Sequence, residues 1–215
     1  MGTEMTTVDG GSGTHGSNSG DSGNDISLVT QVVLAERQGR DRGWWDQMGA
    51  LYWPDSTVRL SWYNGDGAGF VAGSEAMAKR GAVALHHMFA PVVHVRGAKA
   101  YVEVSVAMRF TIDVGNMSGD LVSYTRLNYR LEQRDDRWRI LSLNAIYEYT
   151  TLTPSVPGQT IEVPADELAQ FRSSYAILAW NIARGGIPPS ADELGDDRPE
   201  DVAAFYANVW EWLNA

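Results

Sequence analysis

Three long stretches of β-prone residues in the middle of the chain constrain its fold more than any other feature. They cover residues 100–113, 121–133 and 138–149, and each is rich in β-branched and aromatic side chains. Short links separate them, one containing two glycines and the other the Asp135-Asp136 pair. Consecutive strands joined by short turns pair in antiparallel fashion. We therefore expect an antiparallel meander at the centre of the molecule.

Segments with helical periodicity lie on both sides of this meander. Before it, the pattern predicts helices over about 25–40 and 44–52, a strand over 57–63, a turn at 64–67, a helix from Ser74 to about residue 85, and a strand over 89–96. After it, helices are predicted over 166–184 and 199–213, and their apolar stripes should pack on the sheet or on a second subunit. The expected class is α+β, with a curved sheet wrapped around the N-terminal helices.

The composition divides the chain into three parts. Residues 1–24 are mostly Gly, Ser, Thr, Asn and Asp, which bury too little to offset the entropy of ordering, so a disordered tail is expected. Residues 25–150 form the predicted α+β domain, and residues 151–215 a helical extension packed on it or on a partner subunit.

Charge and composition exclude several classes of partner. A net charge of -10 argues against nucleic acid and anionic membranes, which usually require a basic surface. The absence of cysteine excludes disulfides, thiolate catalysis and cysteine-ligated metals. There is no basic and apolar leader and no apolar run of about 20 residues, so a cytoplasmic protein is expected. The histidines offer no spacing with a carboxylate that would suit a metal, and no cofactor is expected. The partner is expected to be a small uncharged molecule or another protein.

The segment from Asp41 to residue 91 carries the groups most suited to catalysis. Asp41 lies near the end of the first predicted helix, and a His86-His87 pair lies at the start of a strand. A carboxylate that orients an imidazole makes a proton-transfer device that needs neither metal nor cofactor. Because alternate strand residues share a face, only one histidine should line a pocket, and His87 has the same parity as Phe89. We therefore expect Asp41 to pair with His87.

The order of these elements resembles the SnoaL-like group of the nuclear transport factor 2-like superfamily. The resemblance covers about residues 25–149 and is carried by Asp41-Arg-Gly-Trp-Trp-Asp46, Trp53-Pro54-Asp55, Gly73-Ser74-Glu75-Ala76, His86-His87-Met-Phe-Ala-Pro91 and Val93-His-Val-Arg-Gly97. It implies a cone-shaped α+β barrel around an apolar pocket, usually in homodimers or larger homo-oligomers. Members include dehydratases, isomerases, epoxide hydrolases and polyketide cyclases, as well as proteins that only bind ligands.

The scytalone dehydratases of this group suggest roles for individual residues. In them an aspartate at the end of the first helix holds the histidine that moves the proton, and Asp41 and His87 occupy the matching positions. Two family tyrosines that bind water fall on Arg40 and near Trp62, which have no phenol. The substrate contacts expected here are Trp62, Tyr52, Phe89 and, as hydrogen-bond donors on one strand face, Ser123 and Thr125.

Two functions remain open at this point. The first is a cofactor-independent lyase (dehydratase), isomerase or cyclase that acts on a small, apolar, oxygenated molecule through the histidine and aspartate pair. The second is a non-catalytic ligand-binding or dimerisation module of the same fold, in which that pair only ties the first helix to the sheet and the aromatic residues only fill the core. Hydration of an epoxide would require a second carboxylate near a water, and the sequence places none there.

Overall fold

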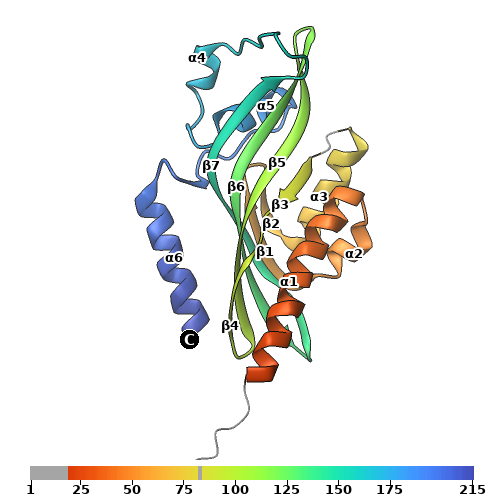
Figure 1. The fold of residues 1–215 in the computed structure, drawn as a ribbon, viewed down its shortest axis with the longest axis vertical. Coiled ribbons are helices and arrows are strands. Elements are labelled where there is room, and N and C mark those ends of the chain that lie inside the picture. The colour runs from red at the N-terminus through yellow and green to blue at the C-terminus, as the bar shows by residue number, and fades with distance from the viewer. Residues whose placement is uncertain (1–18, 82–83) are drawn as a thin grey trace, which may run out of the picture.

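The computed structural model describes residues 19–81 and 84–215, and its dominant feature is one strongly curved sheet (Figure 1). Three long strands, β5 (Lys99–Val114), β6 (Met117–Arg134) and β7 (Arg137–Pro154), pair in antiparallel order as predicted. The sheet runs in the order β2 (Tyr63–Asp66), β1 (Tyr52–Leu60), β7, β6, β5 and β3 (Leu85–Met88). In addition, β4 (Val92–Arg96) pairs with β5, and β8 (Leu194–Gly195) pairs with β7. The α+β class and the central meander are therefore confirmed.

The sheet is mixed, which the sequence did not indicate. β1 (Tyr52–Leu60) runs parallel to β7, and the chain forms β2 to β6 and α3 between these two strands. β1 begins inside the region predicted as the second helix, so the observed α2 (Trp45–Gly49) is only one turn long. The predicted turn at residues 64–67 is also wrong, since β2 (Tyr63–Asp66) is paired with β1 there.

The helices before the meander begin earlier than expected. α1 (Ser19–Arg42) includes residues 19–24 of the predicted tail, because a helix already held by packing extends at little cost per residue. The other residues of that tail lie outside the described part of the chain. α3 (Gly67–Lys79) is capped by Asp66, whose Oδ1 accepts a hydrogen bond from the Gly69 amide at 2.7 Å, rather than by Ser74.

The strand predicted over 89–96 begins later, at Val92, and a short strand that was not predicted precedes it. β3 (Leu85–Met88) and β4 (Val92–Arg96) both pair antiparallel with β5, and residues 89–91 interrupt them. Pro91, which has no amide hydrogen to donate, lies in the interruption.

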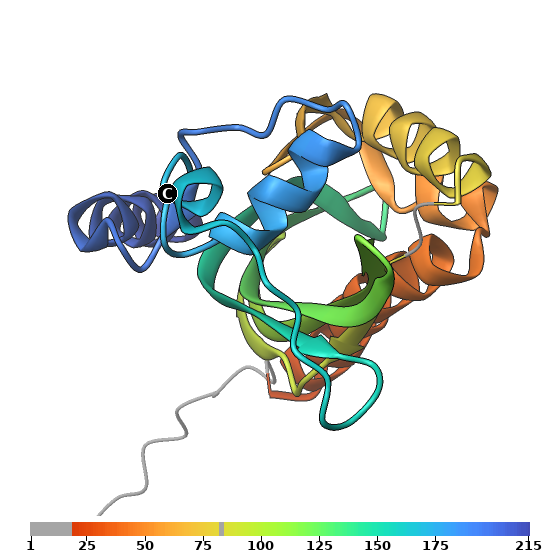
Figure 2. The same cartoon turned by 90° about the horizontal axis from the view of Figure 1, so that it is seen from above.

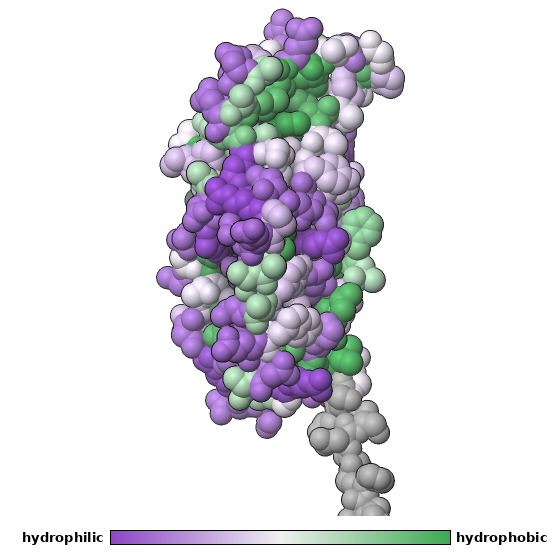
Figure 3. All heavy atoms as spheres, turned by 90° about the vertical axis from the view of Figure 1, so that its left-hand side faces the viewer, coloured by the Kyte–Doolittle hydropathy of each residue, from purple (hydrophilic) through white to green (hydrophobic). Residues whose placement is uncertain are grey.

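The chain after β7 splits into two parts on opposite sides of the sheet. α4 (Ala165–Leu168) and α5 (Ala176–Arg184) replace the single predicted helix, and α5 lies across one end of the curled sheet (Figure 2). After β8 (Leu194–Gly195), α6 (Pro199–Asn214) lies against the outer face near β4 and β5. The face of the molecule that carries α6 is mostly hydrophilic (Figure 3). Among the described residues, no helix has the length and hydropathy needed to cross a bilayer.

The main core fills the concave side of the sheet. Its largest fully buried members include Tyr129, Phe70, Met48, Leu131 and Ile140, which come from α2, α3, β6 and β7. A second, smaller cluster joins Tyr101 of β5 to Val209 and Leu213 of α6 on the outer side. The concave side therefore holds both the core and the candidate site.

Candidate active site

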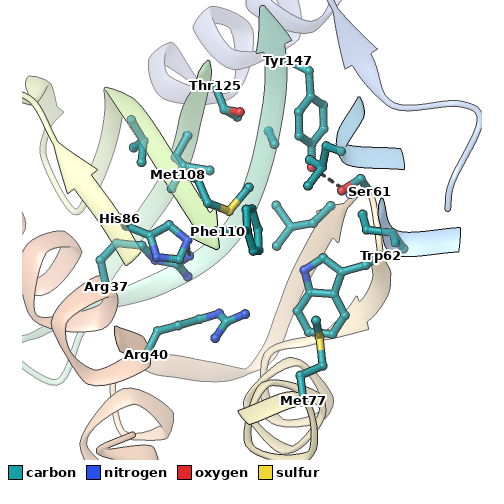
Figure 4. Close-up of a pocket in the computed structure, with 16 residues that line it drawn as sticks. Arg37, Arg40, Ser61, Trp62, Met77, His86, Met108, Phe110, Thr125 and Tyr147 are labelled. Carbon is teal, nitrogen blue, oxygen red and sulfur yellow. Dashed lines mark hydrogen bonds between the residues drawn. The ribbon is translucent and has the colours of Figure 1, made fainter. Parts of the chain in front are cut away.

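A pocket opens inside the curled sheet, between α1, the end of β1, and the helix α5 that covers it (Figure 4). The pocket is narrow, with a cavity of about 50 Å³ for the centres of water-sized molecules, and the space between its side chains reaches about 590 Å³ only when the open mouth is counted. Most of its lining is apolar. The lining side chains belong to Arg37, Arg40, Leu60, Ser61, Trp62, Met77, His86, Val106, Met108, Phe110, Thr125, Leu127, Ala145, Tyr147, Leu178 and Ile182.

Asp41 pairs with His86, not with His87. The Nδ1 atom of His86 lies 2.5 Å from Asp41 Oδ1, and the backbone amide of His86 donates to Asp41 Oδ2 at 2.8 Å. His86 lines the pocket with a side chain that is 4% exposed, whereas the side chain of His87 is on the exposed face of β3. The expected carboxylate-imidazole contact is present, but the choice of histidine was wrong.

One extra residue between β3 and β4 explains this error. From Met88 to Val92 the chain advances four residues, whereas their partners on β5, Val106 and Glu103, are three residues apart. Such a bulge reverses which alternate residues face the pocket. The parity of β4 therefore cannot be carried back to β3, and His86 faces inward.

The two neighbours of the His86 ring define its tautomer. An ionised Asp41 can only accept, so Nδ1 carries the hydrogen, and Arg37 Nη1, which can only donate, lies 3.5 Å from Nε2. Burial lowers the pKa of His86 to about 4. The charges of Arg37 and Arg40 also lower this pKa, whereas the hydrogen bond to Asp41 raises it. Burial opposes ionisation of Asp41, but hydrogen bonds from His86 hold the pKa of that carboxyl below its usual value. The pair is thus an ionised carboxylate and a neutral imidazole at neutral pH.

A buried ion pair behind the pocket holds Arg37 in place. Glu36 is fully buried, and its carboxylate accepts bonds from Arg37 Nε at 2.5 Å, from the Tyr52 hydroxyl at 2.8 Å and from the Tyr129 hydroxyl at 3.2 Å. Although burial disfavours the guanidinium charge, Glu36 raises the pKa of Arg37 well above its ordinary value. Sequence reasoning missed this network, since Glu36 and Arg37 read as an ordinary pair on a helix surface.

The structure separates the other predicted ligand contacts into two groups. Trp62 and Thr125 line the pocket as expected. Ser123 is fully buried and is not part of the lining. Its Oγ atom lies 3.2 Å from Thr125 Oγ1, so the two hydroxyls share a hydrogen bond. Tyr52 is not in the lining because its hydroxyl is bound to Glu36, and Phe89 lies in the interruption after β3 with 58% of its surface exposed. The expectations for Tyr52, Phe89 and Ser123 as pocket-lining contacts are therefore wrong.

Tyr147 is a polar lining residue that sequence reasoning did not select. Its hydroxyl accepts a hydrogen bond from the Ser61 amide at 2.9 Å, and burial raises the pKa of the phenol well above its ordinary value. Within the described part of the chain, the phenol hydrogen has no acceptor. The sequence signal that could have indicated Tyr147 was the alternation of residues along β7, in which Ala145 and Tyr147 share the face toward the pocket.

Comparison with protein families decides the identity of the fold. A model described as a SnoaL-like domain matches residues 23–144. The chain belongs to the SnoaL-like family. This family is part of the nuclear transport factor 2-like superfamily, so the predicted resemblance is confirmed. Among curated proteins, no sequence matches the chain significantly.

Solved structures of the same fold share little sequence with this SnoaL-like protein. A hexachlorocyclohexane dehydrochlorinase from Novosphingobium barchaimii aligns with a TM-score of 0.54 and 15% identity, over 67% of this chain and 98% of its own. A proposed scytalone dehydratase from Novosphingobium aromaticivorans gives 0.52 and 14%, over 66% and 97%. A protein of unknown function from Mycobacterium tuberculosis aligns with a TM-score of 0.52 and 14% identity, over 85% of this chain and 99% of its own. At these identities the likeness concerns the fold alone.

The site offers no obvious place for a metal. In the described ranges, 19–81 and 84–215, no three His, Asp or Glu side chains are grouped so that they could hold an ion. The polar groups that reach the pocket are instead one imidazole, two guanidinium groups and a few hydroxyls.

Proposed function

We propose that this protein is a cofactor-independent lyase (dehydratase) or isomerase that removes a proton from carbon in a small, largely apolar, oxygenated molecule. The observation that carries the proposal is the pairing of Asp41 with both the ring and the backbone of His86 at the wall of an apolar pocket. This pairing makes Nε2 of a neutral imidazole the basic atom, and the contact of Arg37 Nη1 with Nε2 at 3.5 Å must give way when that atom takes a proton. The distant likeness to dehydratases and dehydrochlorinases supports the same class of chemistry.

The proposed reaction begins with transfer of a C–H proton to His86 Nε2. Asp41 stabilises the resulting imidazolium without taking the proton itself. A base whose pKa is about 4 is weak, so the C–H bond must be acidified by an adjacent carbonyl. The hydroxyls of Tyr147 and Thr125 are among the pocket groups able to donate to that carbonyl oxygen as it gains negative charge.

The imidazolium then returns the proton. In a dehydration the C–O bond breaks and the proton leaves with the hydroxyl group as water, whereas in an isomerisation the proton is delivered to another carbon of the same molecule. The positive charges of Arg37 and Arg40 disfavour the imidazolium form of His86, which favours this return of the proton.

Proton exchange with solvent tests the proposal even while the natural substrate is unidentified. A panel of small cyclic ketones, β-hydroxy ketones and keto acids is incubated with the protein in D₂O, and loss of the signal of the C–H beside the carbonyl is followed by proton NMR. We expect exchange of at least one compound to fall by about 10²- to 10⁴-fold in His86→Ala and steeply in Asp41→Asn. His87→Ala, an exposed neighbour on the same strand, should exchange as fast as the unmodified protein.

The same experiment separates the enzyme from a non-catalytic binding module. A binding module would retain compounds from the panel without exchanging their protons, and its ligand affinity would survive Asp41→Asn. Exchange that persists in His86→Ala would contradict the role given to the imidazole.

A further inference from the structure

We propose that the molecule bound in this pocket is a small acid, and that the guanidinium of Arg40 holds its carboxylate. This inference names the substrate class for the proposed function and depends on it for the reaction, but the binding step is independent of any chemistry. Arg40 lies on α1, immediately before Asp41, and its side chain points into the pocket toward Trp62 (Figure 4).

Arg40 is a buried cation without a counter-ion of its own. The residue is 8% exposed, and among the described residues no hydrogen bond or ion pair reaches its guanidinium. The guanidinium instead lies over the ring of Trp62, whose centre is 5.8 Å from Arg40 Cζ. Burial, followed by repulsion from Arg37, lowers the pKa of Arg40 to about 10, so it remains charged at neutral pH.

The two carboxylates nearest in sequence are already fully engaged. Both oxygens of Asp41 accept from His86, and both oxygens of Glu36 accept from Arg37, with Tyr52 and Tyr129 completing that set. A guanidinium has five N–H donors, and those of Arg40 have no protein acceptor among the described residues and reach the pocket space. A ligand that brings its own acceptor into the pocket can use these donors.

A carboxylate fits these donors better than a neutral oxygen does. It accepts two parallel hydrogen bonds from the planar fork of an arginine and balances its charge. Elsewhere the lining is mainly apolar, with Leu60, Val106, Leu127 and Leu178 contributed by four different elements. The geometry suits an amphipathic molecule with one acidic end at Arg40 and an apolar body along the sheet.

The mouth of the pocket is also basic, although the whole chain carries a net charge of -10. A second hollow shares Met77, Phe110 and Ile182 with the pocket and is lined by Arg80 and Arg184, with Asp113 as its one acidic residue. Two arginines beside the pocket favour the approach of an anion to this part of an otherwise acidic protein.

An acid at Arg40 would also strengthen the proposed base. Arg40 is one of the groups that lower the pKa of His86. A carboxylate placed on Arg40 offsets that positive charge, so the imidazole binds a proton more readily when substrate is present. Substrate binding and base strength are then coupled through one residue.

Unreactive acids and their amides test the binding step. Acetate, isobutyrate and cyclohexanecarboxylate are titrated against the full chain by calorimetry, each beside the amide of the same shape. We expect at least one carboxylate to bind about ten-fold or more tightly than its amide, as a charge-assisted pair requires. The preference should disappear in both Arg40→Gln and Arg40→Met and persist in His87→Gln, whose side chain is exposed, with thermal unfolding used to show that each variant is folded. Arg59→Gln, which removes a cation that does not line the pocket, serves as the matched control.

The outcomes separate this inference from the proposed function. If no carboxylate binds more tightly than its amide, or if the preference survives in folded Arg40 variants, the inference is wrong whatever the exchange experiment shows. If acids bind through Arg40 but no compound exchanges protons in a His86-dependent way, the pocket is a receptor for small acids and only the catalytic proposal fails.

Discussion

At the scale of single residues, the site is defined by two carboxylates whose oxygens already accept hydrogen bonds and by polar groups that face the pocket. Both carboxylate oxygens of Asp41 accept hydrogen bonds from His86. The carboxylate oxygens of Glu36 accept hydrogen bonds from Arg37 and from two tyrosine hydroxyls. Two of the polar groups that face the pocket are the Nε2 atom of His86, which Arg37 Nη1 approaches at 3.5 Å, and the guanidinium of Arg40, a base and a cation. One can receive a proton and the other can hold an anion, which is the pair of tasks proposed here.

The neutral state of His86 makes folding stability depend on pH. Its pKa is about 4 in the folded protein and about 6.5 in the unfolded chain, so the unfolded chain takes up a proton first as the pH falls. Between pH 6.5 and 4 this group alone removes up to about 3 kcal/mol of unfolding free energy, and below pH 4 the loss stops growing. Urea unfolding at pH 7 and pH 4.5 should show a smaller loss in His86→Gln than in the unmodified protein. His87→Gln is the control, and parallel losses in all three proteins would contradict the assignment.

At the scale of elements, the sequence predicts most where one signal dominates. The strands β5, β6 and β7 were predictable because each is a long β-prone stretch bounded by turn residues. The short elements were not, since Tyr52 and Pro54 read equally well as the end of a helix and belong to β1 instead. The facing of His86 depends on one extra residue opposite β5, which alternation within a single strand cannot reveal. In the sequence, Arg40 stood out only as the residue at the position of a family tyrosine. Its lack of a hydrogen-bond partner is a property of the folded chain and cannot be read from the sequence.

The helix α5 covers one end of the curled sheet and forms part of the pocket wall. Leu178 on α5 is almost fully buried and lines the pocket, so shortening it removes packing and enlarges the space below the helix. We expect Leu178→Ala to lower the unfolding free energy by about 2–4 kcal/mol, measured by denaturant titration. Val156→Ala, in the exposed crossing before α5, should change it by less than about 0.5 kcal/mol. A loss below about 1 kcal/mol for Leu178→Ala would mean that α5 does not pack on the sheet as described.

At the scale of the whole molecule, the residues after β7 contribute to two separate surfaces of one sheet. The helix α5 covers the concave side, where the pocket lies, while α6 covers the outer side over Tyr101. No residue of α6 lines the pocket, and the sheet lies between them. The SnoaL-like match ends at residue 144, so both helices lie beyond the part of the chain shared with the family model.

This separation predicts that α6 can be released without loss of the site. Val209 is fully buried against Tyr101, and Val209→Asp places a charge in that contact, at a cost that the protein can avoid by releasing the helix. We expect the variant to be cut by protease within residues 196–215 at concentrations that leave the unmodified protein intact, while the His86 ring signals in NMR stay unchanged. Ala207→Asp, on the exposed side of the same helix, should resist cleavage like the unmodified protein. If releasing α6 shifts the His86 signals, the two sides of the sheet are coupled and the pocket is not independent of its outer helix.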